Sequence, residues 1–265
     1  MNAEQSPSNA PRVLLAEDNP VNQAVCRAML ERLGAAVQVV GDGEEAVRAF
    51  EAGGIDLILM DCQMPRMDGY QATGVIRERE KAAGAGRRVA IVALTAHAMQ
   101  GDREKCLAAG MDDYLSKPFR QAELASVVAR WTDAAGREVP AQGGSAAAGP
   151  HLDAGVLAAL RELGSGAEGE ALVANLAGLF LEDAPERLRA ARAAAAAGDA
   201  AGLRAAVHTL KSSAASMGAL RLSELAHALE RDARDALPPE ALARLAEMEA
   251  EFEATKPELE RLRAR

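Results

Sequence analysis

Aromatic residues and cysteines are scarce in this sequence. Phe, Trp and Tyr make up only 3% of the 265 residues, whereas hydrophobic residues as a whole reach 49%. That hydrophobic fraction is typical of a globular protein, whose cores must here pack mainly with Leu, Val, Ile and Ala. Cys26, Cys62 and Cys106 are an odd number of cysteines at wide spacing. They therefore predict buried thiols in a reducing compartment, not a disulfide framework or a zinc site.

An excess of basic charge and long apolar runs are also lacking. The net charge is −9, which argues against a nucleic-acid-binding domain. The apolar runs are far too short to span a membrane, and the polar residues 1–11 do not resemble a signal peptide. The sequence contains no glycine-rich motif of the kind that binds ATP in kinases. We expect a cytoplasmic protein that does not insert into a membrane and cannot phosphorylate itself from ATP.

Short apolar runs alternate with helical stretches in the first half of the chain. The runs are 13–16, 37–40, 55–60, 89–94 and a weaker 113–116. Runs that are apolar on both faces are typical of a parallel sheet covered by helices. Five such βα units predict a flavodoxin-like, doubly wound α/β domain over residues 12–131, with strand order 2-1-3-4-5.

The pattern changes after this domain. Residues 132–150 are rich in Gly, Ala and Ser and predict a flexible linker. Residues 151–265 contain no strand signal and predict an all-α domain, an antiparallel four-helix bundle with an extra N-terminal helix. Pro185 is expected to kink or interrupt the second of these helices, and Asp199 to cap the next one.

Polar residues follow four of the predicted strands at the end where ligands bind in such sheets. Glu17 and Asp18 follow the first strand and Asp61 the third, so the three carboxylates should converge. Carboxylates brought together need a cation, and oxygen ligands favour Mg²⁺. Thr95 and Lys117 end the fourth and fifth strands. A metal, a lysine and a hydroxyl around Asp61 suit phosphoryl transfer with Asp61 as the nucleophile.

Four strings in this half resemble the receiver domains of two-component systems, in particular those attached to hybrid sensor kinases. They are Leu14–Pro20 (LLAEDNP), Met60–Tyr70 (MDCQMPRMDGY), Ala93–Met99 (ALTAHAM) and Gly110–Phe119 (GMDDYLSKPF). The resemblance implies that Asp61 is the phosphoacceptor. It implies that Asp18, Asp61 and the backbone carbonyl of Gln63 bind the metal, with Glu17 acting partly through water. It also implies that Thr95 and Lys117 hold the phosphoryl oxygens and that the Lys117–Pro118 peptide is cis.

Tyr114 lies three residues before Lys117, on the strand expected beside the one that ends in Thr95. We expect phosphorylation to move Thr95 and Tyr114 together as a switch. His97 is either an exposed loop histidine or, with Gln63, a residue that governs access of water to the phosphoryl group.

In the second half, His208 lies on an amphipathic helix. The apolar positions form one stripe, made of Leu203, Val207, Leu210, Ala214 and Met217. His208 is roughly 140° from the centre of this stripe and should be exposed. Lys211 shares its side, where it could offset phosphate charge. Ser212, Ala215 and Ala219 are small enough to let a partner approach.

The string Ala206–Ala219 (AVHTLKSSAASMGA) resembles the motif of histidine phosphotransfer (HPt) domains, and Phe180–Leu188 (FLEDAPERL) is also similar to that family. Ser212 stands where glycine is commoner. The resemblance implies that His208 is a phosphocarrier.

Three functions stay open at this point. In a phosphorelay, a sensor histidine kinase would phosphorylate Asp61, and His208 would pass the group to a downstream response regulator; the chain could be the C-terminal part of a hybrid kinase. Alternatively, the chain is a phosphorylation-switched binding module or a phosphate sink in which His208 serves a different receiver. A phosphatase with an aspartyl-phosphate intermediate is the third, although Gln63 stands where its second Asp is expected.

Overall fold

A computed structural model describes residues 10–84, 88–95, 100–132, 151–234 and 236–264 of the chain. Residues 10–132 contain a parallel sheet of five strands: β1 (Arg12–Ala16), β2 (Ala36–Val40), β3 (Leu57–Asp61), β4 (Ala90–Thr95) and β5 (Asp113–Ser116). The strand order is β2-β1-β3-β4-β5, with β1 pairing in parallel with both β2 and β3. The predicted topology is confirmed. The expected linker 132–150 lies outside the described residues except for Thr132.

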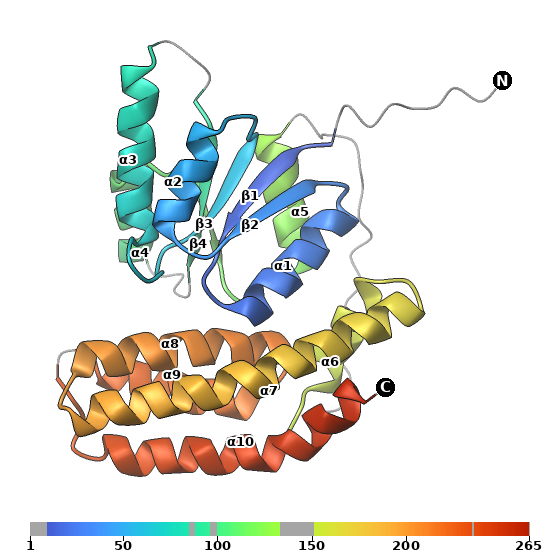
Figure 1. Ribbon diagram of the computed structural model, residues 1–265, viewed down its shortest axis with the longest axis vertical. Helices are drawn as coiled ribbons and strands as arrows, with labels where there is room; N and C mark the ends of the chain where they lie inside the picture. Colours follow the sequence, from blue (N-terminus) through green and yellow to red (C-terminus); the bar gives the residue numbers. More distant parts are fainter. Residues whose placement is uncertain (1–9, 85–87, 96–99, 133–150, 235, 265) are drawn as a thin grey trace. The chain divides into compact units, whose positions relative to one another are not determined.

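Helices cover both faces of this sheet (Figure 1). They are α1 (Pro20–Arg32), α2 (Gly43–Glu51), α3 (Gly69–Ala82), α4 (Gln100–Ala108) and α5 (Gln121–Trp131). Side chains alternate along the central strands. Leu14, Ile58 and Ile91 pack with α2 and α3, and their neighbours Leu15, Leu59 and Val92 pack with α1 and α5. Both faces of the sheet are therefore apolar. This is why each strand appears in the sequence as a continuous apolar run and not as an alternation of apolar and polar residues.

An arginine joins three elements at the amino end of β4. The Arg77 guanidinium, on α3, donates to the backbone oxygens of Gly110 (2.8 Å) and Val89 (2.9 Å). It also forms ion pairs with Glu80 at 2.7 Å and Asp112 at 2.6 Å. Asp112 in turn accepts a hydrogen bond from the backbone of Ile91 in β4. The end of α4, the start of β4 and α3 are therefore fixed to one another at this edge.

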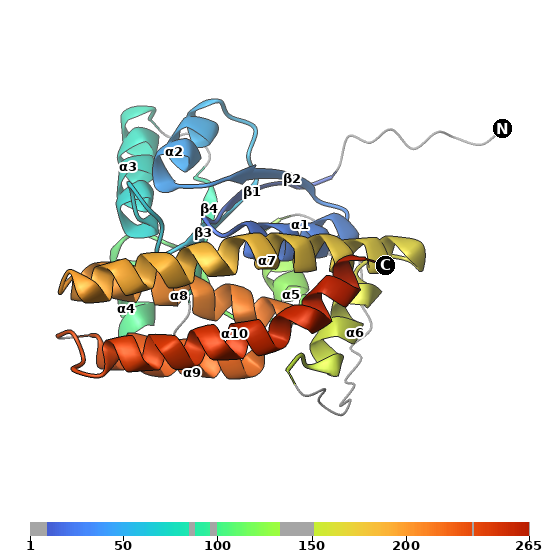
Figure 2. The ribbon, with the colours of Figure 1, turned by 60° about the horizontal axis from the view of Figure 1, so that its bottom comes forward.

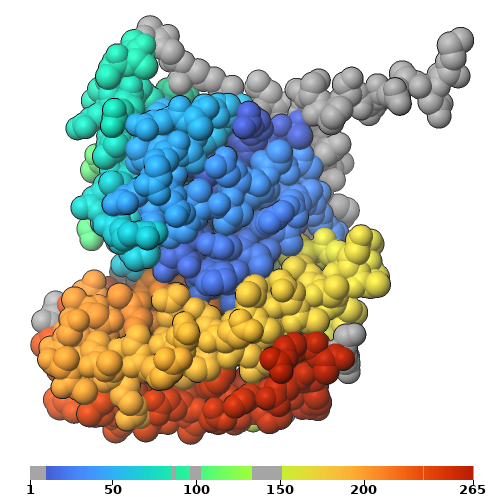
Figure 3. All heavy atoms as spheres, viewed as in Figure 1, coloured from blue at the N-terminus to red at the C-terminus, as the bar shows by residue number. Residues whose placement is uncertain are grey.

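The second part of the chain is helical in all its described residues from Ala154 onward apart from short connections. Its helices are α6 (Ala154–Glu162), α7 (Ala167–Ala196), α8 (Ala200–Met217), α9 (Leu220–Asp232) and α10 (Ala241–Arg263). Helices α7 to α10 form a bundle in which each packs against two of the others (Figure 2). Helices α7 and α10 adjoin along one face of this bundle, coloured yellow to orange and red in Figure 3. The expected four-helix bundle with an extra N-terminal helix is present.

Two predictions concern the start of α8 and the continuity of α7. Asp199 caps α8 as predicted, its side chain accepting a hydrogen bond from the backbone of Gly202 at 2.9 Å. Pro185 was expected to kink or interrupt its helix; the interruption is wrong, because α7 runs through Pro185 for 30 residues, and the kink stays a prediction. Proline removes a backbone donor in the helix interior, but Phe180, Ala184 and Leu188 around it are all buried. Their packing outweighs the missing hydrogen bond.

All three cysteines are buried as free thiols, as expected. Cys62 and Cys106 lie in contact, with 3.9 Å between their sulfur atoms. Burial raises the pKa of the Cys26 thiol to about 12, so this group stays neutral and acts as a small apolar side chain. No helix in the described residues is long and apolar enough to cross a membrane.

Candidate functional site

The end of strand β3 places Asp61 in a closely packed corner. The next backbone amide, of Cys62, donates to Leu94 of β4 at 3.1 Å. Gly69, the first residue of α3, approaches so closely that a Cβ atom there would meet the Asp61 backbone oxygen at 2.1 Å. Only glycine fits this contact, and it fixes the start of α3 beside the strand end. Asp61 itself is only 4% exposed.

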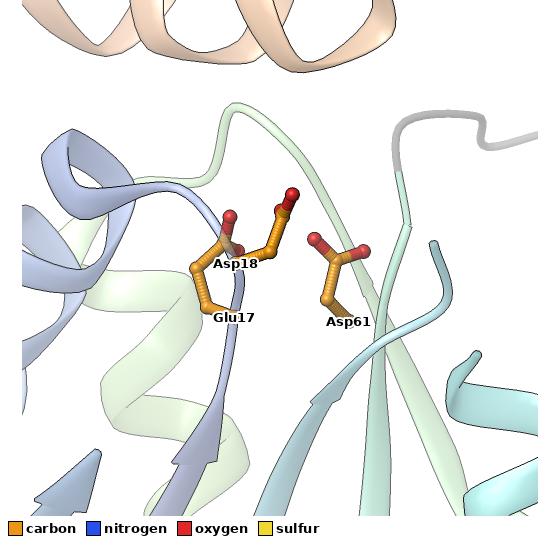
Figure 4. A group of neighbouring side chains, drawn as sticks. All are labelled: Glu17, Asp18 and Asp61. Carbon is orange, nitrogen blue, oxygen red and sulfur yellow. The ribbon is translucent and has the colours of Figure 1, made fainter. Parts of the chain in front are cut away.

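Three carboxylates from two strands point toward one another at this corner. Glu17 and Asp18 follow β1, and Asp61 ends β3 (Figure 4). One oxygen from each of the three lies within 4.8 Å of the others. Adjacent strands with parallel direction bring their carboxyl ends to one edge, which is why residues so distant in sequence meet. The predicted convergence is present.

Lys117 balances part of this negative charge. Lys117 Nζ lies 2.6 Å from Asp61 Oδ2 and also forms an ion pair with Glu17. Although burial lowers the pKa of Lys117, Asp61 and Glu17 raise it above its ordinary value, so the ammonium stays charged. The Lys117–Pro118 peptide is cis, in agreement with the expectation from resemblance.

Asp61 binds its proton more tightly than an ordinary aspartic acid. Burial raises the pKa of Asp61 to about 8, with Lys117 opposing and Glu17 reinforcing this effect. A carboxylate with this pKa favours either a proton or a cation at neutral pH. The oxygen-only donor set fits a small divalent cation such as Mg²⁺.

Other predicted residues lie close to this cluster or outside the described chain. The Gln63 backbone amide donates to Asp61 Oδ1 at 3.1 Å. Thr95 ends β4, beside the strand that Asp61 ends, and is 6% exposed. Tyr114 lies on β5 opposite Ala93, half-buried, with the Arg103 guanidinium 6.0 Å from its ring centre. His97 lies outside the described residues.

A second polar cluster lies in the helical bundle around His208. His208 Nδ1, on α8, is 2.6 Å from Glu230 Oε1, on α9. Lys211 Nζ, one turn after His208, donates to the other oxygen of the same carboxylate at 2.6 Å. Burial raises the pKa of Glu230, but His208 and Lys211 outweigh it and lower this pKa to about 2. Glu230 is therefore ionised at neutral pH.

His208 is 8% exposed in the whole chain, with Glu230 of α9 in contact with its ring, and its exposure in the helical domain by itself stays a prediction. The helical stripe of α8 is correct: Leu203, Val207 and Leu210 are fully buried. The position of His208 on its own helix does not predict its contact with Glu230 of α9. Among the small residues expected beside it, Ser212 and Ala215 are partly exposed, whereas Ala219 is buried in the turn between α8 and α9.

The sequence did not lead us to predict Glu230 as a residue of this cluster. Its signal is a charged residue next to the apolar positions of α9, one turn after Ala226 and directly after Leu229, both fully buried. An acid on the inner side of an amphipathic helix requires a partner. Nothing in the sequence alone identifies His208 and Lys211 as that partner.

Comparisons with known proteins match both halves of the chain. The family description "Response regulator receiver domain" matches residues 13–129, and "Hpt domain" matches residues 175–263. The sensor histidine kinase GacS of Pseudomonas protegens is 39% identical over 203 residues, which are 77% of this chain and 22% of that protein. The kinase BarA of Shigella flexneri is 31% identical over 245 residues, 89% of this chain and 26% of that protein. The chain thus spans about a quarter of the length of these relatives.

Among solved structures, one similar chain is the receiver domain of the sensor histidine kinase PA1611 from Pseudomonas aeruginosa PAO1. It is 56% identical, covers 46% of this chain and 97% of its own, and has a TM-score of 0.42. That domain is described with a magnesium ion coordinated in its active site cleft.

Proposed function

The chain belongs to the phosphorelay signalling proteins, with a response regulator receiver domain followed by an Hpt domain, and we propose that it carries a phosphoryl group first on Asp61 and then on His208. The observation that carries this proposal is the buried cluster in which Lys117 and two further carboxylates surround Asp61. A sensor histidine kinase would supply the phosphoryl group, and the receiver of a downstream response regulator would take it from His208. We place this relay in the cytoplasm, which the free thiols favour.

At the receiver, Glu17, Asp18 and Asp61 would hold Mg²⁺, together with the backbone carbonyl of Gln63. The bound ion would neutralise charge on the phosphoryl oxygens. One oxygen of Asp61 attacks phosphorus, and the donor's nitrogen leaves with the electron pair of the broken bond. Lys117, already 2.6 Å from the Asp61 carboxylate, is positioned to hold a phosphoryl oxygen, and the Thr95 hydroxyl to hold another.

In the relay step, the phosphoryl group is transferred from the Asp61 oxygen to a ring nitrogen of His208. An acyl phosphate is a good donor because the carboxylate that leaves is a weak base. Lys211 lies within one turn of His208 and can offset the charge of the transferred group. Neither His208 nor Lys211 would need a metal ion for this step.

The relay is tested with two variants that each lack one carrier. Asp61→Asn cannot be phosphorylated on the receiver, and His208→Gln cannot be phosphorylated on the Hpt domain. We expect label placed on Asp61 of the wild-type chain to reach His208. We also expect a mixture of labelled His208→Gln with Asp61→Asn to transfer label, more slowly at low concentration. Label that reaches His208 in neither experiment would show that this receiver does not serve this Hpt domain.

Phosphorylation should also change the surface around Tyr114. Strands β4 and β5 pair so that Tyr114 lies opposite Ala93, two residues before Thr95. When the Thr95 hydroxyl turns toward the phosphoryl oxygens, it vacates space that the Tyr114 ring can enter, away from Arg103.

NMR of the Tyr114 ring in a Tyr70→Phe background, which leaves one tyrosine, measures this switch. We expect the ring to become less exposed on phosphorylation, whereas Thr95→Ala should abolish the change. Equal ring exposure in both forms of the receiver would contradict it.

A further inference from the structure

The connection between β3 and α3, residues 62–68, carries the Gln63 carbonyl that would bind the metal ion. Hydrogen bonds hold this connection where it leaves the strand and where it enters the helix. The Gln63 amide donates to Asp61 Oδ1 at 3.1 Å, and the Gly69 amide donates to the Cys62 carbonyl at 3.3 Å. The residues between them lie outside any helix or strand, so their position depends on contacts with other elements.

Arg66, in this connection, has a backbone conformation that is uncommon for its residue type. Its φ of 65° lies in the left-handed region, and no other non-glycine residue in the described part of the chain has a positive φ. Glycine adopts this conformation without the strain that a Cβ atom brings. Arginine at such a position indicates that its side chain is used, because the backbone alone would favour glycine.

The Arg66 side chain reaches the carboxylate that begins α2. Asp42 is fully buried, and its Oδ1 accepts a hydrogen bond from the Glu45 backbone amide at 2.7 Å, as an N-cap does. Its Oδ2 forms an ion pair with the guanidinium of Arg66, whose side chain is 60% exposed. Because a buried carboxylate needs a counter-charge, Asp42 fixes Arg66, and with it the connection, to the start of α2.

A second contact joins the same two segments. The Gly43 amide donates to the Met67 carbonyl at 3.1 Å, and a Cβ atom at Gly43 would meet that oxygen at 2.5 Å. Two successive residues of the connection 62–68 thus contact two successive residues at the start of α2. Just before them, Val40 at the end of β2 accepts a hydrogen bond from the Glu17 amide at 3.1 Å. The turn from β2 to α2 is therefore bonded to both sides of the carboxylate cluster.

We propose that Arg66 and Asp42 are positioning residues for the metal ion: their ion pair fixes the place of the Gln63 carbonyl relative to the three carboxylates. This inference rests on the metal site of the proposed function and adds to it the residues that hold one of the ligands in place. Neither Arg66 nor Asp42 touches the ion or the phosphoryl group in this arrangement.

The position of a metal ligand affects affinity because Mg²⁺ tolerates little error. The ion binds its ligands in a near-octahedral arrangement at about 2.0–2.1 Å. Residues that orient a metal ligand without touching the ion change metal affinity about ten- to a hundredfold when they are replaced. Loss of the ion pair should therefore weaken the binding of Mg²⁺. An excess of the ion should restore phosphorylation, because Asp61 and Lys117 are unchanged.

The test uses the full chain and variants of both partners. Asp42→Asn keeps a good N-cap residue and removes the charge. Arg66→Asn removes the guanidinium but keeps a residue type that accepts the left-handed conformation, and Arg66→Lys keeps a positive charge. The double variant Asp42→Asn/Arg66→Asn leaves neither charge without its partner. Arg79→Gln is the control, because the exposed Arg79 also joins α3 to α2, through an ion pair of 3.3 Å with Glu51 at the other end of α2.

Three measurements separate metal binding from folding and from phosphorylation. NMR titration of the backbone amides with MgCl₂ gives the affinity for the ion, and urea unfolding in EDTA gives the stability without it. Labelling of Asp61 by an acyl phosphate is followed at several concentrations of Mg²⁺.

We expect Asp42→Asn, Arg66→Asn and the double variant to bind Mg²⁺ about ten- to a hundredfold more weakly than the wild type. The three losses should be similar and not additive, since each variant removes the same interaction. At saturating Mg²⁺ their labelling rates should approach that of the wild type. Arg66→Lys should recover part of the affinity, and Arg79→Gln should change none of it.

Unchanged affinity for Mg²⁺ in a folded Arg66→Asn chain overturns the proposal even if its stability in EDTA falls, because the ion pair would then serve folding alone. The double variant decides in the same way if Asp42→Asn does not fold. A wild-type chain that does not bind Mg²⁺ overturns the proposal as well. A wild-type chain that binds Mg²⁺ but never takes label on Asp61 instead refutes the proposed function, and the affinities of the variants still decide the role of the ion pair.

Discussion

Replacing Asp61 with asparagine will remove all metal-dependent, base-labile phosphate label from the receiver when a small acyl phosphate is the donor. The amide cannot form an acyl phosphate, and it removes one of the three carboxylates that lie within 4.8 Å of one another. Asp56→Asn is the matched control, because Asp56 lies just before the other end of the same strand. Full base-labile label on Asp61→Asn, measured as the radiolabel that base treatment removes, would show that another residue is the acceptor.

The same variant should change how stability depends on pH in the absence of metal. Burial raises the pKa of Asp61 from 3.8 to about 8. A carboxyl whose pKa is raised by folding contributes stability below its ordinary pKa, and this contribution is lost as the pH rises through about 8. In EDTA the unfolding free energy of the wild type should therefore fall more between about pH 5 and about pH 9 than that of Asp61→Asn. Parallel curves in urea titrations would contradict the raised pKa of Asp61.

Replacing Lys117 with methionine will have the second large effect, on both folding and phosphorylation. Lys117 is the cation that contacts Asp61 and Glu17, and removing one partner of a buried ion pair costs about 3–5 kcal/mol. Loss of a charge that stabilises the transferred phosphoryl oxygens should lower the labelling rate about 10²- to 10³-fold.

The two effects are separable by measurement. Urea unfolding in EDTA reports the first, and the rate of labelling by an acyl phosphate with Mg²⁺ reports the second. Lys105→Met, which removes an exposed lysine from α4, is the control and should change neither. Lys117→Arg keeps the charge and should retain more stability than Lys117→Met. A Lys117→Met chain that is as stable and as rapidly labelled as the wild type would exclude both roles.

The sheet and the acidic cluster could be predicted because they follow from chain order. Strands that are apolar on both faces must be covered by helices, and their carboxyl ends meet at one edge, so Glu17 and Asp61 had to approach one another. The contact of Glu230 with His208 could not be predicted in this way. A helical wheel gives the side of α8 on which His208 lies, but the residue of α9 that meets this side depends on how the two helices pack.

Two other differences have causes of their own. Ala219 falls on the side of His208 only if α8 continues, but the helix ends at Met217 with Gly218 in the left-handed conformation (φ 84°). Pro185 has the local signal of a helix break, yet the helix continues through it, with the buried residues Phe180, Ala184 and Leu188 around it. At Pro185, therefore, packing overrules a rule that holds for an isolated helix.

The Arg77 network at the far end of β4 limits where a phosphorylation signal can travel. Thr95 ends β4 at the acidic cluster, while Arg77 ties the start of β4, through Val89, to the carboxyl end of α4, through Gly110. Helix α4 is thus anchored at its carboxyl end. A displacement that begins at Thr95 can swing the amino end of α4 about this anchor, but it cannot slide the whole helix along the sheet. The receiver would then signal by a change in the angle of α4. The displacement of this helix would be largest near the phosphoryl group and would fall to zero at Arg77.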